Sequence, residues 1–199
     1  MYVRRQSELV AREPHKTFSQ VGLPVGPAYV FHELAFNAPS ETLVATVLSR
    51  QAGEIWHIRL FLRAAGESAY REVPIGDETT FISDVVVCSE TPDAFVNIRR
   101  WTQPDRKAAD SLAIYRVALP LGTVQRLPAV FRRGGSPTNL FISDLLGPAS
   151  NSKGLGVVVG ETTEVADPPG GHRTDYYACS FDVETGEVEI IAELPATFA

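Results

Sequence analysis

A short sequence that occurs twice sets the strongest constraint on the fold of this chain. Phe-Ile-Ser-Asp stands at Phe81–Asp84 and again, sixty residues later, at Phe141–Asp144, and a looser third copy begins at Phe31. Each copy is followed by a polar turn, an apolar run, a polar loop, another run and a short closing strand. Self-similarity with a fixed period is typical of repeat architectures, in which each repeat is one supersecondary unit.

Each repeat reads as four strands, because short apolar runs rich in β-branched and aromatic residues alternate with turn residues. We expect strands at Phe31–Phe36, Leu43–Ser49, Glu54–Leu62 and Tyr70–Val73, then at Phe81–Val87, Phe95–Trp101, Leu112–Leu119 and Thr123–Leu127, and last at Phe141–Leu146, Leu155–Gly160, Asp175–Asp182 and Val188–Ala192. Long loops are expected at Thr102–Asp110, Pro128–Leu140 and Glu161–Arg173. A repeated four-stranded antiparallel meander is the make-up of a propeller blade.

The second repeat also resembles a known family. Phe81–Asp84, the turn Ser89–Asp93, the strand Leu112–Val117 and the segment Gly122–Leu127 are similar to a TolB-type β-propeller repeat, over about residues 31–192. The family's turn glycine is replaced by Ala94 here. The resemblance implies a propeller fold, and many such propellers bind proteins or peptides.

Three blades are too few to close a ring, which typically takes four to eight. We therefore predict an all-β fold, a truncated or half β-propeller, with blades at about 31–80, 81–140 and 141–199 and an N-terminal extension at 1–30 that packs on it. Both outer flanks would be uncovered apolar sheet faces. A homodimer is our first expectation for covering them, an N-terminal cap the second and a different partner chain the third.

The bulk composition narrows the classes of function. The chain has 199 residues, 44% of them apolar, and a net charge of −6, which argues against binding to nucleic acid or to an anionic membrane. It begins without an apolar signal segment, so we expect a cytoplasmic protein. Cys88 and Cys179 stand in apolar strands of different repeats and are expected to be reduced, buried thiols.

The long loops should share one face of the blades, and extended loops on a rigid scaffold are where binding residues gather. Arginine forks match carboxylates, and Trp and Arg are favoured anchors of interfaces. We therefore predict a site for an acidic or carboxylate-bearing peptide on this face. Its expected residues are Trp101, Arg106, Lys107, Arg132, Arg133, His172 and Arg173. The alternative is a solvated face whose arginines pair with neighbouring acids.

Motifs for catalysis, metals or cofactors are not found in the sequence. The histidines and cysteines lack the spacing of metal ligands, and no nucleophile elbow is present, so no catalytic residue, metal or cofactor is predicted. Asp84 and Asp144 hold equivalent places in the repeat. We expect each to bond nearby backbone N–H groups, although paired carboxylates can also serve acid–base chemistry.

The sequence thus favours a non-catalytic module that binds a peptide or protein segment, at an exposed blade edge or on the long-loop face. One setting for such a module is a scaffold or accessory protein of a biosynthetic pathway, which presents a precursor peptide to modifying enzymes. Two alternatives stay open. The first is a small hydrolase or lyase that uses Asp84, Asp144 and loop histidines, and the second is a structural subunit that completes a larger propeller.

Overall fold

The computed structural model describes residues 2–5, 8–11, 19–22, 29–49, 57–76, 80–102, 107–109, 113–131, 140–148, 154–165 and 171–195. Side chains are described from residue 33 onward within these ranges, except for 49, 57, 100–109, 164–165 and 171–172. The described part of the chain consists of β-strands and their connections, without an α-helix. In this part, accordingly, no helix is long and apolar enough to cross a membrane.

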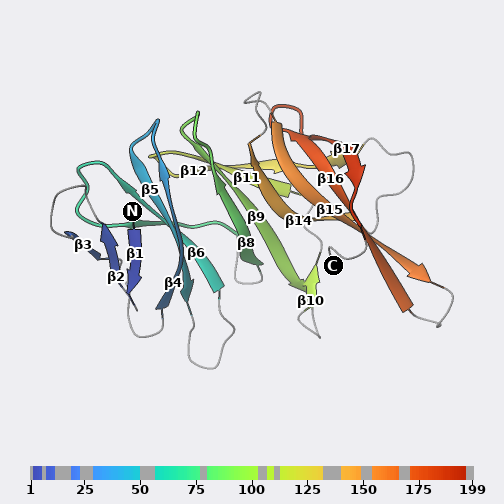
Figure 1. Cartoon of the computed structure of the whole chain (residues 1–199), viewed down its shortest axis with the longest axis horizontal. Helices are drawn as coiled ribbons and strands as arrows, with labels where there is room; N and C mark the ends of the chain where they lie inside the picture. The colour runs from blue at the N-terminus through green and yellow to red at the C-terminus, as the bar shows by residue number, and fades with distance from the viewer. Residues whose placement is uncertain are drawn as a thin grey trace.

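Three antiparallel sheets of four strands stand in a row along the molecule (Figure 1). The first sheet, or blade, consists of β4 (Tyr29–Asn37), β5 (Thr42–Ser49), β6 (His57–Ala64) and β7 (Arg71–Val73). The second blade consists of β8 (Thr80–Val87), β9 (Asp93–Thr102), β11 (Ala113–Ala118) and β12 (Thr123–Pro128). The third blade consists of β14 (Leu140–Pro148), β15 (Gly154–Val165), β16 (Gly171–Asp182) and β17 (Glu187–Glu193). Every strand expected from the three repeats is found. The all-β fold with blade-like sheets of a partial β-propeller is therefore confirmed.

Shorter strands extend this arrangement. β10 (Lys107–Ala109) pairs with the end of β9, and β13 (Val130–Phe131) runs parallel to the start of β17. β1 (Tyr2–Arg5), β2 (Glu8–Ala11) and β3 (Ser19–Gly22) form a separate antiparallel sheet. That sheet lies at the end of the row, on the side of the first blade that faces away from the second (Figure 1).

The second blade is buried on both faces, because apolar residues of β9 alternate between its two neighbours. Ala94, Val96 and Ile98 pack toward the first blade, and Phe95 packs toward the third. A strand that packs on both sides needs apolar residues at nearly every position. This explains why the repeat has continuous apolar runs rather than a strict alternation of apolar and polar residues.

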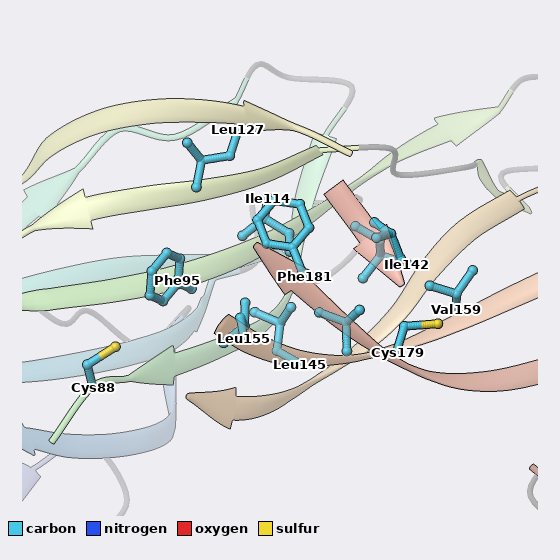
Figure 2. Packing of buried hydrophobic residues seen from close by; sticks show 12 residues of the cluster. Cys88, Phe95, Ile114, Leu127, Ile142, Leu145, Leu155, Val159, Cys179 and Phe181 are labelled. Atoms are coloured by element: carbon cyan, nitrogen blue, oxygen red, sulfur yellow. The ribbon is translucent and has the colours of Figure 1, made fainter. Parts of the chain in front are cut away.

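The core between the second and third blades is the larger of the two. Ile114 of β11 and Phe181 of β16 lie together near its centre, and neither is exposed (Figure 2). Cys88 and Cys179 lie at opposite ends of the same cluster and are both free thiols (Figure 2). The expected reduced, buried cysteines are thus what the structure shows.

The repeated tetrapeptide encodes a β-bulge at the same place in each blade. The register between the first two strands slips past His32 in the first blade, Ser83 in the second and Ser143 in the third. A bulge re-aims the residues that follow it and twists the strand locally. The bulge aligns Glu33 with Asp84 and Asp144, so each blade has an acidic residue just after its bulge. The copy in the first blade therefore begins at Val30, one residue earlier than the sequence suggested.

The outer face of the first blade, which points away from the second blade, is largely covered. Ala45, Val47 and Phe61 share the face of the first sheet that points away from the second blade. They are 0%, 1% and 3% exposed, so the chain itself covers this flank. On the opposite flank of the molecule, formed by the third blade, Leu146 remains 58% exposed. Val158 on the same outer face is 1% exposed, and Phe36 on the outer face of the first blade is 52% exposed. Among the described residues, each outer face therefore combines buried residues with a large exposed apolar side chain.

All three expected long loops are in part strand. Thr102–Asp110 contains β10, which pairs with the end of β9. β15 and β16 pair without interruption, from Gly154 opposite Asp182 to Val165 opposite Gly171. Most of Glu161–Arg173 is therefore part of a β-hairpin. Within Pro128–Leu140, Val130 and Phe131 form β13. Polar, β-branched residues such as Thr162 and Thr163 continue a ladder without burying a face, which is why composition alone suggested a loop.

Candidate functional site

The structure describes only one side chain of the site that the sequence predicted, that of Arg173. Arg106, Arg132 and Arg133 lie outside the described residues. Trp101, Lys107 and His172 lie in β9, β10 and β16, but their side chains are outside the described part too. The proposed basic group on the long-loop face therefore remains a prediction for these six residues.

Arg173, the described member, already has a partner. It stands in β16 with 65% of its side chain exposed, and its Nε donates to Oδ1 of Asp175 at 2.8 Å. An exposed pair of this kind contributes about 0–1 kcal/mol. The pair is of the kind expected for a solvated face, and a role of Arg173 in binding stays a prediction.

Asp84 links two blades. Its Oδ1 accepts a hydrogen bond from the backbone N of Val85 at 2.8 Å, and its Oδ2 accepts one from the backbone N of Leu145 at 2.7 Å. Leu145 lies just after the bulge of the next blade. Both oxygens are thus used by backbone donors, which confirms the structural role expected for Asp84.

Asp144, its equivalent, has different surroundings because no further blade follows in the described chain. Its carboxylate is exposed and accepts a hydrogen bond from the hydroxyl of Ser143 at 2.6 Å. The expectation of a bond to a local backbone N–H is wrong for Asp144. Within the residues that the structure describes, no group of three or more metal-binding side chains is found.

Arg99 and Asn97 complete the link between the second and third blades. Asn97 is fully buried, and its Nδ2 donates to the carbonyl of Ile142 at 3.0 Å. Arg99 donates to the carbonyl of Ser143 at 2.7 Å and stands over the ring of Phe141, with 5.9 Å between the guanidinium carbon and the ring centre. Both side chains therefore hold the scaffold together instead of facing a ligand.

The outer part of the third sheet contains a cavity of about 450 Å³. Its lining combines apolar and aromatic residues from all five strands of the sheet, β13 included: Phe131, Leu140, Val159, Tyr177, Val188 and Ile190. Cavities that bind small groups commonly have volumes of about 300–1,000 Å³ and mostly apolar walls. This cavity is large enough for a side chain or a small ligand.

The polar part of the cavity lining is acidic. Asp182, Glu187 and Glu189 contribute to it, and the Tyr177 hydroxyl bonds Oε2 of Glu161 at 3.1 Å. Asp182 also holds the turn between β16 and β17, because its Oδ1 accepts from the backbone N of Glu184 and of Thr185 at 2.8 Å. The site therefore pairs apolar walls with carboxylates.

The edge of β17 lies beside this cavity. β13 covers β17 only at Glu187 and Val188, and no other described strand pairs with the outer side of Glu189–Glu193. Ile190 is 40% exposed and Ile191 is 70% exposed on this segment. An edge of this kind presents backbone donors and acceptors that another strand can use.

The sequence predicted the strand Val188–Ala192 but not a site there. The signal that points to it is charge: residues 141–199 contain ten Asp and Glu but only two Lys and Arg. The cavity itself depends on the pairing of β13 with β17, which joins residues far apart in the chain and leaves no local pattern.

No protein-family model matches the chain, and no curated protein matches it. Among solved structures it is similar to a dipeptidyl aminopeptidase IV-like protein from Bacteroides ovatus, with 10% sequence identity and a TM-score of 0.48. The match covers 92% of this chain but only 27% of that one, so the chain spans about a quarter of the length of that protein.

Proposed function

We propose that this protein is a non-catalytic module that binds an extended peptide segment of another protein. The observation that carries the proposal is the edge of β17 at Glu189–Glu193, which is open among the described strands and lies next to the cavity. Strand addition to an exposed sheet edge gives affinity through main-chain hydrogen bonds, and neighbouring pockets give specificity.

Ile190 connects the two parts of this site. It belongs both to the cavity lining and to the open edge. A strand that pairs with β17 would direct alternate side chains to the two faces of the sheet, and those on the cavity side would reach its apolar walls. Exposed Ile190 and Ile191 would lose contact with water in the complex, which favours binding.

The alternative of a hydrolase or lyase depends on Asp84 and Asp144 as a catalytic pair. Asp84 has both oxygens occupied by backbone N–H groups of two blades. A general base must instead reach a proton of the substrate. The binding module is therefore the function that the described geometry supports best. A TolB-like ancestry of the blades and a role in presenting a precursor peptide belong to the same proposal.

The proposal is tested by selecting binders from a random peptide library displayed on phage. We expect enriched peptides of β-forming residues, and hydrogen exchange should show protection of the β17 amides when a selected peptide is bound. Recovery of no peptide, or protection confined to other strands, would contradict the proposed site.

A matched pair of substitutions separates the site from general effects on stability. Ile190→Ser changes a residue that lines the cavity, whereas Ile191→Ser changes an adjacent residue of the same type that does not. Both start partly or largely exposed, so both variants should fold. We expect Ile190→Ser to weaken binding roughly tenfold or more and Ile191→Ser to weaken it less. Equal effects would argue against the cavity as part of the site.

A further inference from the structure

The net charge of the third blade bears on the charge of the peptide that would bind there. The whole chain has a net charge of −6, but residues 141–199 contain ten acidic and two basic residues, a net of −8, and residues 1–140 contain fourteen acidic and sixteen basic residues, a net of +2. The negative charge of the protein is therefore concentrated in one blade, the blade that has both the open edge and the cavity.

Two glutamates place part of this charge on the open edge itself. Glu189 and Glu193 stand in the open part of β17 and are exposed, and neither forms an ion pair with another described residue. Glu189 pairs with Ser180 across the ladder and Glu193 pairs with Tyr177, with a bulge between them. Because Ser180 and Tyr177 lie on opposite faces of the sheet, the bulge places one carboxylate toward each face.

Glutamate on both faces of an edge strand repels an acidic partner from either side. It also disfavours two copies of this chain meeting edge to edge, since like charges would face each other across the new ladder. A strand that has Lys or Arg side chains would instead find a carboxylate on each face, and apolar Ile190 and Ile191 between them.

We propose that the peptide segment bound at the β17 edge is basic, with lysine or arginine side chains beside apolar ones. This inference rests on the proposed function, and it differs from the acidic ligand that the arginines of the long-loop face suggested. The cavity adds Asp182 and Glu187 to the edge glutamates, because its charged lining residues are Asp182, Glu187 and Glu189. An extended segment with a cation and an apolar side chain at neighbouring positions matches both features.

The test uses three short labelled peptides in which valine alternates with lysine, glutamine or glutamate. Fluorescence anisotropy with the full-length protein measures their affinities at low and at high salt. We expect the lysine peptide to bind about tenfold more tightly than the glutamine peptide at low salt, and the difference to shrink at high salt because exposed charges are screened. The glutamate peptide should bind most weakly.

Binding of the same peptides to matched variants shows which glutamates cause the preference for lysine. Glu189→Gln with Glu193→Gln should remove most of the preference for lysine. Glu41→Gln with Glu90→Gln makes the same change in net charge at two exposed turns of the other blades and should leave the preference in place. If both double variants reduce it equally, the edge is not what selects the cation.

The two proposals fail in different ways. If all three peptides protect the β17 amides and bind with equal affinity, the basic partner is excluded and the binding edge stands. The glutamates then serve only to keep edges of different molecules apart. If no library-derived peptide or alternating peptide protects these amides, the binding edge itself is excluded, and the inference about charge is excluded with it.

Discussion

Asp84 and Asp144 occupy equivalent positions of the repeat, but their hydrogen bonds differ because their neighbouring blades differ. Asp84 accepts hydrogen bonds from the backbone of its own blade and of the next blade, at Val85 and Leu145. Asp144 is exposed and is bonded by the neighbouring Ser143 hydroxyl. Charge-assisted hydrogen bonds to backbone N–H groups are among the stronger ones in proteins. The same residue type therefore contributes differently at the two positions.

We expect Asp84→Ala to lower the free energy of unfolding by about 2 kcal/mol, because it leaves two backbone donors without their acceptor. Asp144→Ala should change it by less than about 0.5 kcal/mol, as is usual for an exposed side chain. Urea denaturation of the two variants makes the comparison. A similar loss for both would show that Asp84 does not hold the blades together.

Cys179 makes stability depend on pH in the alkaline range. Burial raises the pKa of this thiol to about 11, from an ordinary value of 9.0. Between these values the unfolded chain has lost the proton and the native chain retains it, so the free energy of unfolding falls as pH rises from about 9 to 11. Below about pH 9 both states keep the proton and the contribution is constant.

Cys179→Ala should flatten this alkaline decline when urea midpoints are measured across the range. Part of the slope should remain, because burial also raises the pKa of Cys88. An unchanged slope in the variant would assign the alkaline decline to other groups.

At the scale of elements, the turn between β16 and β17 contacts the end of β12 and the start of β13. Gly186 has a φ of +77°, and the backbone N of Val130 donates to its carbonyl at 2.8 Å. A Cβ at Gly186 would clash with the carbonyl oxygen of Pro128. Gly66 has a similar φ of +82°, but a Cβ there would meet nothing within 4 Å.

The two glycines therefore form a matched pair. Gly66→Ala should cost about 1–2 kcal/mol, the usual price of a left-handed conformation for alanine. Gly186→Ala should cost about 2 kcal/mol more, because the turn must also move away from Pro128. Thermal or urea unfolding measures both. Equal losses would mean that the contact between Pro128 and Gly186 does not constrain the turn.

The strands were largely predictable from the sequence, and the site was not. Runs such as Phe95–Trp101 identify strands by their own composition, and the repeat gives their order. The open edge and the cavity depend on which strands lie side by side, and β13 with β17 is a pairing between distant segments. The arginines that composition emphasised are mostly outside the described residues, and the described Arg173 pairs with Asp175.

At the scale of the whole molecule, the two ends of the row of blades both combine buried and exposed apolar residues. The flank of the first blade is buried within the chain, as Phe61 at 3% exposure shows. Phe36 lies on the same face of this sheet but is 52% exposed. The flank of the third blade exposes Leu146. Val158 on that same face is 1% exposed. A homodimer, the first arrangement that the sequence suggested, stays a prediction.

Phe61 and Phe36 test whether the chain covers its own first flank. Phe61→Ala should cost about 3–5 kcal/mol, the range for deleting a buried aromatic ring, because its surroundings collapse only in part. Phe36→Ala removes a half-exposed ring from the same face and should cost about 1 kcal/mol. Urea denaturation gives both values. They should be independent of protein concentration, since the cover belongs to the same chain. If the cost of Phe61→Ala grows with concentration while light scattering shows a dimer, a second copy supplies the cover, and the flank is an interface after all.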